Sequence, residues 1–150
     1  MAQFFTKYID ENTVLPVREL TSSVFLIAIK DGKILAIQNE RGWDIPGGHV
    51  EEGESVLEGL VREVQEEGGA TFQNEKLLAL IESDDEGKYK DKVMLVYMAD
   101  NFELGEFVPS EDAFGREEVE IEEFIKRYSQ SHSALDLIDM VHRAKELLNK

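Results

Sequence analysis

The chain has 150 residues, 32 acidic and 16 Lys or Arg, and its formal net charge of −16 at pH 7 argues against stable nucleic-acid binding, which needs clustered basic side chains. It contains no cysteine, which excludes disulfides, zinc–thiolate sites and a cysteine nucleophile, and it has no apolar run long enough to span a membrane. With 42% hydrophobic residues and no basic, apolar leader at its start, we expect a soluble cytoplasmic protein with a single domain over residues 1–150.

The first third of the chain predicts short strands joined by tight turns. The first 20 residues carry weak strand signals of the kind found at a sheet edge; their aromatic side chains either pack in the core, stack on a base or seal a contact in a homodimer. Ser23–Lys30 and Lys33–Gln38 are apolar and rich in β-branched residues, and Asp31–Gly32 between them is typical of a hairpin turn. A shorter strand is predicted at Trp43–Ile45, before the breaker cluster Pro46–Gly48.

A helix is predicted to begin at Glu54 or Ser55 and to end at Glu67, where Gly68–Gly69 supplies a left-handed stop. Four aliphatic residues fall on one narrow face of this helix, which is expected to dock on the core: Leu57, Leu60, Val61 and Val64. Three carboxylates lie together on a flank of that face: Glu63, Glu66 and Glu67.

These three carboxylates repel one another and destabilise an isolated helix. A divalent cation between them removes the repulsion, and hard oxygen ligands of this kind are those that magnesium prefers. The alternative is a solvated acidic helix face. Gly59, four residues before Glu63, weakens the helix, which is explained if a bulky group such as a metal-bound phosphate approaches the backbone there.

The second half of the chain predicts further strands and two helices. Extended segments are expected at Ala70–Phe72, Glu75–Glu82 and Val93–Met98, with a turn at residues 83–90 and an irregular connection at residues 102–115. Helices are expected at Glu117–Tyr128 and Ala134–Leu148. Strands on both sides of one long helix, followed by terminal helices, indicate an α/β protein with a mixed sheet between helical layers.

One stretch of the chain matches a known pattern. Gly48 is followed after five residues by Glu54, and after seven more by Arg62–Glu63; an aliphatic residue, a variable residue, Glu66–Glu67, another variable residue, Gly69 and a small apolar residue complete it. This pattern is the Nudix box, so the chain resembles the Nudix hydrolase family in its MutT-like form. The resemblance implies a Nudix-type α/β/α sandwich, in agreement with the predicted elements.

The resemblance also implies an activity and its cofactor. Nudix enzymes hydrolyse a nucleoside diphosphate linked to another moiety, with water attacking a phosphoanhydride in the presence of Mg²⁺, for which Mn²⁺ can substitute. By this resemblance the metal ligands are Glu63, Glu66 and Glu67 with the backbone carbonyl of Gly47. Carboxylate-held magnesium can gather phosphates, orient a water and stabilise developing charge.

Catalytic roles are expected for the carboxylates of the box. Glu66 is the first candidate for the base that helps deprotonate the attacking water. The alternatives are carboxylates expected in a later loop, Glu111, Glu117 and Glu118. The spacing of these residues does not choose among them.

Arg62 and Glu54 are expected to act as a pair. A long arginine side chain can span the two helical turns between them and hold the glycine turn and the helix in register, so we expect Arg62 to orient the site rather than to contact substrate. Substrate contacts are expected instead from residues outside the box: Arg41, Lys90 and Glu111.

The substrate is expected to be a small nucleotide or nucleotide derivative. The short chain and simple loops resemble the MutT-type pyrophosphatases, which favours a nucleoside triphosphate. The alternatives are ADP-ribose or another nucleotide sugar, a dinucleoside polyphosphate, or a non-catalytic nucleotide-binding regulatory module of the same family. Such modules typically lose carboxylates of the box, whereas this chain has all of them.

Overall fold

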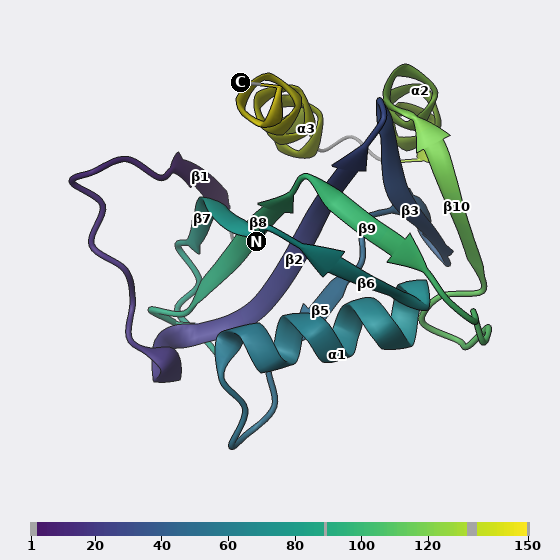
Figure 1. Cartoon of the computed structure of the whole chain (residues 1–150). Helices are drawn as coiled ribbons and strands as arrows, with labels where there is room; N and C mark the ends of the chain where they lie inside the picture. Colours follow the sequence, from purple (N-terminus) through teal and green to yellow (C-terminus); the bar gives the residue numbers. More distant parts are fainter. Residues whose placement is uncertain (1–2, 89, 132–134, 150) are drawn as a thin grey trace.

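A mixed sheet with a hydrophobic core on each face organises the chain (Figure 1). The computed structural model describes residues 3–88, 90–131 and 135–149. Within these residues the main sheet has the strand order β1 (Phe4–Tyr8), β7 (Lys76–Ser83), β8 (Val93–Ala99), β2 (Thr21–Lys30), β3 (Lys33–Asn39) and β10 (Gly115–Glu120). Two short strands extend it, β4 (Gly42–Asp44) beside β3 and β5 (Gly47–His49) beside β2.

Helices cover both faces of this sheet (Figure 1). The helix α1 (Val56–Gly68) lies on one face, with the small sheet of β6 (Ala70–Gln73) and β9 (Asn101–Leu104) following it. On the other face lie α2 (Ile121–Ser131) and α3 (Leu135–Leu148), and a short 3-10 helix, η1 (Arg18–Leu20), precedes β2. The strands β2 and β8 are parallel and the other pairs antiparallel, so the predicted α/β/α sandwich with a mixed sheet is confirmed. Among the described residues no helix is long and apolar enough to cross a membrane.

The central strand β2 supplies both cores because its side chains alternate between the faces. Leu26 and its even-numbered neighbours pack with Leu60 and Val64 of α1. Ile27 and Ile29 face the other core, with residues of α2 and α3. The hairpin from β2 to β3 turns at Asp31 and Gly32, whose φ angles of 52° and 76° are those of the predicted two-residue turn.

The limits of α1 agree with the prediction to within about two residues. Ser55 caps its start: the hydroxyl accepts the Glu58 N–H, and the Glu58 carboxylate accepts the Ser55 N–H. At its end Gly69 adopts the left-handed conformation, with φ 56°. These two local signals fix the segment that carries the box.

The docking face of α1 differs from the predicted one. Leu60 and Val64 are fully buried, whereas Leu57 and Val61 are 41% and 54% exposed. The sheet contacts the helix on the side of Leu60, so the docked face turns away from Leu57 and Val61. Glu63 and Glu67 share this inward side and are only partly exposed.

Two predictions for the later chain are wrong. Glu117 and Glu118 lie in the strand β10, not in a helix or a loop, and α2 begins only at Ile121. Glutamate favours helices, but pairing with β3 outweighs this preference, with Val119 buried between exposed neighbours as in an edge strand. The segment 102–115, which was expected to be irregular, contains the end of β9. The predicted breaker cluster Pro46–Gly48 contributes its two glycines to the strand β5.

The N-terminal strand β1 lies at a sheet edge, as predicted, and pairs only with β7 within the described residues. Tyr8 packs against the core, but Phe4 and Phe5 are 58% and 53% exposed. Core packing is therefore wrong for these two phenylalanines. Of the last predicted helix, Ala134 lies outside the described residues, and α3 is described from Leu135.

Candidate active site

Strand β5 directs the backbone groups of its odd-numbered residues toward α1. Leu26 donates its N–H to Pro46 and Val50 donates to Ser22, each at 3.0 Å, so alternate residues between them face β2. Gly47 therefore points its N–H away from β2, and this N–H donates to Oε1 of Glu67 at 3.0 Å. In an extended strand the carbonyl of a residue points to the same side as its N–H, which aims the Gly47 oxygen at the region of Glu67.

Gly48 allows the carboxylate of Glu63 to lie against the strand. A Cβ atom at position 48 would sit 2.8 Å from the Glu63 carboxylate, closer than such contacts are found. Gly59 has a related role, since a Cβ there would lie 3.2 Å from Oε1 of Glu54 and from Val50. The glycine at position 59 is thus explained by the packing of the loop that precedes α1, and not by the expected approach of a phosphate.

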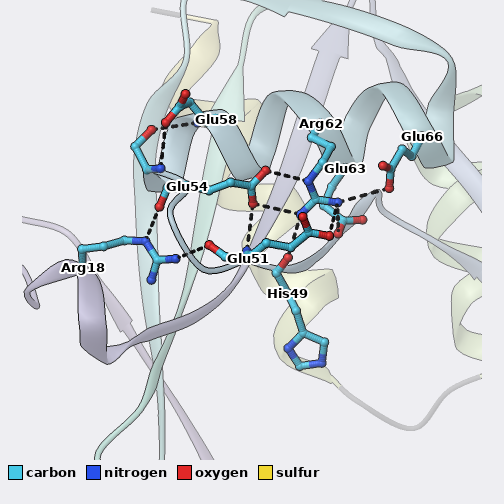
Figure 2. Close-up of polar contacts among 9 residues, drawn as sticks. Arg18, His49, Glu51, Glu54, Glu58, Arg62, Glu63 and Glu66 are labelled. Carbon is cyan, nitrogen blue, oxygen red and sulfur yellow. Dashed lines mark hydrogen bonds and ion pairs between the residues drawn. The ribbon is translucent and has the colours of Figure 1, made fainter.

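Arg62 joins the loop before α1 to the carboxylates on the helix (Figure 2). Its Nε donates to Oε2 of Glu54 at 2.6 Å and its Nη2 to Oε1 at 3.0 Å, a two-pronged contact. The same Nη2 donates to the carbonyl of His49 at 3.0 Å. Nη1 reaches Oε1 of Glu63 at 3.0 Å and Oε2 of Glu66 at 3.2 Å.

The electrostatic environments of these carboxylates differ. Hydrogen bonds from Arg62, then from the Glu51 N–H, lower the pKa of Glu54 to about 2. Burial raises the pKa of Glu67 to about 7, and the nearby Glu63 and Asp112 add to the shift. Burial also raises the pKa of Glu63, against the effect of Arg62. For Glu63 and Glu67, burial is therefore the main cause of the raised pKa, and neighbouring carboxylates add to it.

Two openings meet at Glu67. An open cleft of about 590 Å³ is bordered by Arg62, Glu63, Glu66 and Glu67 and by the loop 105–114, including Asp112. A smaller pocket of about 220 Å³, also bordered by Glu67, is lined by Gly47, Asp112, Arg41, Asp44 and Glu111. Since Glu67 and Asp112 border both openings, a ligand can contact the box carboxylates and Gly47 together.

The residues of this site fit a divalent cation by their chemistry. They offer hard oxygen donors, and a cation would also relieve the repulsion from Glu63 and Asp112 that adds to the raised pKa of Glu67. Among the described residues, however, no three acidic or histidine side chains already converge on one point. The reason is visible in the contacts, because Arg62 holds Glu63 and Glu66 while the Gly47 N–H holds Glu67.

The residues predicted outside the box are divided by the fold. Arg41 and Glu111 border the smaller pocket beside Gly47, with Arg41 3.7 Å from Asp44. Lys90 instead lies in the connection between β7 and β8, 3.6 Å from Glu86, and is not among the residues bordering either opening at Glu67. Glu117 is 3.4 Å from Arg127, and neither it nor Glu118 borders these openings.

A third pocket lies close to Gly47. Its volume is about 460 Å³ and its walls are mostly apolar, formed by Phe4, Phe25, Ile81 and Met94, with Ser22, Ser23, His49, Ser83, Asp85 and Lys92 as polar groups. Phe25 also borders the smaller pocket and pairs with Gly47 across the sheet. A planar apolar group placed here would thus lie next to the carboxylate site.

Sequence reasoning missed three residues of this region. Asp112 lies in an irregular loop, Asp44 at the end of a short strand and Arg18 in the 3-10 helix, so none belongs to a periodic pattern. Arg18 donates to the backbone carbonyls of Glu54 and Glu51. No residue spacing marks a contact to a backbone oxygen more than thirty positions away.

The unusual pKa of Glu67 predicts a pH dependence of stability in the metal-free protein. A folded-state pKa of about 7, against the ordinary 4.5 of a glutamate, means that the folded state binds this proton more tightly. Its stabilising contribution is complete below about pH 4.5 and is lost as the pH rises through about 7. Glu67→Gln keeps an oxygen for the Gly47 N–H and carries no charge.

Both proteins are measured in chelator. We therefore expect the Tm of Glu67→Gln minus the Tm of the unsubstituted protein to increase by a few degrees between pH 4.5 and pH 7.5. About 1 kcal/mol corresponds to ~2–4 °C in a chain of this size. Glu103→Gln, an exposed change on β9, is the control and should show no such trend. A Tm difference for Glu67→Gln that stays constant across this range would contradict the assignment.

Comparisons with known proteins agree with this geometry. A family model of the NUDIX domain matches residues 18–147. The Nudix hydrolase YvcI of Bacillus subtilis is 35% identical over 77 residues, covering 48% of this chain and 49% of YvcI. An ADP-ribose pyrophosphatase of Methanocaldococcus jannaschii is 36% identical over 76 residues, covering 47% of this chain and 45% of that protein. The aligned segments thus span about half the length of these relatives.

A solved structure shows the same fold over nearly the whole chain. The Bacillus subtilis pyrophosphohydrolase BsRppH superposes with a TM-score of 0.70 and covers 96% of this chain and 90% of its own. Its sequence identity is 24%, so the likeness concerns the fold. Together with the match of the family model, this likeness agrees with the fold that the box implied.

Proposed function

Because this chain belongs to the Nudix hydrolase family, we propose that it is a metal-dependent pyrophosphohydrolase, which cleaves a phosphoanhydride of a nucleoside triphosphate by attack of water. The observation that carries the proposal is that Glu63, Glu66 and Glu67 border one open cleft, where Glu67 also accepts the Gly47 N–H. Such a cleft, bordered by carboxylates and by one arginine, suits a phosphate chain only when cations screen the charge.

Each residue of the site has a proposed role. Glu63, Glu66, Glu67 and the Gly47 carbonyl would hold Mg²⁺, or Mn²⁺ in its place. When bound, the cation would neutralise phosphate charge and make water more acidic. Glu66 accepts the proton of the attacking water, since it is the most exposed of the three carboxylates and borders the cleft, with 59% of its side chain accessible.

Glu111 is the remaining alternative as the base. It borders the smaller pocket beside Gly47, whereas Glu117 and Glu118 border neither opening at Glu67. Arg62 orients the site through Glu54, as its two-pronged contact supports. Arg41 borders the smaller pocket, which supports its proposed contact with a phosphate or ribose, and Lys90 is not among the substrate contacts that we now propose.

The short chain with its simple loops favours a nucleoside triphosphate, and the apolar pocket beside Phe25 suits the base of a nucleotide. With the base in that pocket, the phosphate chain would extend across β5 toward Gly47 and the box carboxylates. The second candidate is ADP-ribose or another nucleotide sugar, which the similarity to the Methanocaldococcus jannaschii ADP-ribose pyrophosphatase favours. A dinucleoside polyphosphate is compatible with the same site, and a non-catalytic nucleotide-binding module is disfavoured because the box carboxylates are all present.

The decisive experiment is a turnover screen in Mg²⁺ or Mn²⁺ with nucleoside triphosphates, ADP-ribose, nucleotide sugars and dinucleoside polyphosphates. We expect the highest kcat/KM with a nucleoside triphosphate, yielding the monophosphate and pyrophosphate, with ¹⁸O from labelled water in one product and no turnover in chelator. A higher kcat/KM with ADP-ribose would show that ADP-ribose is the preferred substrate, while the proposed hydrolysis of a phosphoanhydride would stand. Failure of every substrate with both metals would overturn the proposed activity.

A further inference from the structure

Arg18 holds the loop before α1 from the side opposite to Arg62 (Figure 2). Its Nε donates to the Glu54 carbonyl at 2.6 Å and its Nη2 to the Glu51 carbonyl at 2.8 Å. Its Nη1 lies 3.3 Å from the carbonyl of Thr21, at the start of β2. One guanidinium therefore ties two carbonyls of the loop to the sheet.

The loop 51–54 depends on such polar anchors. Glu51, Glu52 and Gly53 are exposed, and Gly53 has a positive φ of 86°, so this turn gains little from apolar packing. Its own bonds are short-range, from the Glu54 N–H to the Glu51 carbonyl and from the Glu51 N–H to the Glu54 carboxylate. A loop of this kind opens locally unless its backbone is bonded to a rigid element.

The contacts of Arg18 continue into the carboxylate cluster. Arg18 fixes the main chain of Glu54; the Glu54 carboxylate fixes the guanidinium of Arg62; and Arg62 bonds the side chains of Glu63 and Glu66. Outer partners of this kind decide how the groups that bind a ligand are oriented. Arg18 is also committed to three carbonyls, which suits orientation rather than contact with a phosphate.

We propose that Arg18 is a positioning residue of the active site, which sets the geometry of the Glu54–Arg62 pair, and through it that of Glu63 and Glu66, by clamping the loop 51–54. The kinetic consequence rests on the proposed function and the metal titration on its proposed metal site, whereas the effect on the Arg62 hydrogen bonds depends on neither. Arg18 stands outside the Nudix box, so the box alone does not specify this geometry.

The test compares Arg18→Met and Arg18→Lys with Arg143→Met. Arg143 is a matched control because it also contacts the N-terminal part of the chain, over the ring of Tyr8 at 4.2 Å, and its loss changes the net charge equally. In the substrate-free proteins, NMR follows the exchange of the Arg62 Nε–H, and a titration with Mn²⁺ gives the metal Kd. Steady-state kinetics then separate kcat from KM.

We expect Arg18→Met to speed exchange of the Arg62 Nε–H and to raise the Mn²⁺ Kd, each about tenfold, and to lower kcat by a similar factor with a smaller change in KM. Arg18→Lys should change the exchange rate, the Mn²⁺ Kd and kcat less than Arg18→Met does, but by more than half as much on a logarithmic scale. An ammonium lacks the planar fork that meets two carbonyls. Arg143→Met should leave all four quantities unchanged.

The inference is overturned if Arg18→Met lowers Tm while the Arg62 Nε–H exchange and the Mn²⁺ Kd stay at their original values. If Arg18→Met does not fold, Arg18→Lys decides by the same two measurements. If the unsubstituted protein hydrolyses no nucleotide, the proposed function fails, and the exchange and metal measurements still decide the role of Arg18.

Discussion

Glu66→Gln is expected to lower kcat by at least about 10²-fold, the largest effect of any single substitution with little change in the fold. The change keeps the shape of the side chain but removes a charge that the cleft presents to a cation or to the attacking water. Its structural cost is small, since Glu66 is exposed and its contact with Arg62 at 3.2 Å is an exposed helix pair, worth about 0.3–0.5 kcal/mol.

The kinetic measurement also separates Glu66 from the competing base Glu111. If Glu66 is the base, Glu66→Gln loses the acidic limb of the kcat–pH profile, while Glu111→Gln keeps that limb and loses less than tenfold. Glu103→Gln, exposed on β9, controls for the loss of one negative charge and should retain full activity. Full activity of Glu66→Gln on the best substrate would show that the proposed metal and base assignments are wrong.

The features predicted correctly from the sequence depend on residues close together in the chain. Asp31–Gly32 specifies a hairpin by the backbone angles that it tolerates, and the glycines after Glu67 end α1 for a similar reason. Glu63, Glu66 and Glu67 border one cleft, as expected for carboxylates grouped on one flank of a helix, because their spacing lies within α1. In each case the decisive interaction is local, so a pattern in the sequence contains it.

The errors arise where distant parts of the chain decide. Residues 117–120 form a strand because β3 offers pairing, and nothing in their own composition shows that β3 is near. Val61 is exposed because the position of the sheet, not the helix itself, selects which side of α1 is covered. Arg18 and Asp112 reach the site through nonlocal contacts with a loop and a cleft, so neither leaves a periodic signal.

Arg62→Lys is expected to weaken metal binding in the substrate-free protein by about 10-fold or more, together with a fall in kcat. Arg62 uses a planar fork to bond both oxygens of Glu54 and also reaches His49, Glu63 and Glu66. Lysine keeps the positive charge but has no such fork. Because the charge is unchanged, its repulsion of a cation is unchanged as well, and the difference reports the geometry of the carboxylates.

The opposite reading of Arg62 makes a different prediction for the same protein. If Arg62 clamps a substrate phosphate, Arg62→Lys should leave the metal Kd of the substrate-free protein as it was and raise KM instead. Arg127→Lys is a suitable control, since Arg127 also bonds two carboxylates, Glu117 and Glu123, but does not contact the box. We expect Arg62→Lys to raise the metal Kd and Arg127→Lys to leave it unchanged. An unchanged metal Kd with a raised KM would assign Arg62 to the substrate, because a residue that only orients the carboxylates cannot lose its fork without disturbing them.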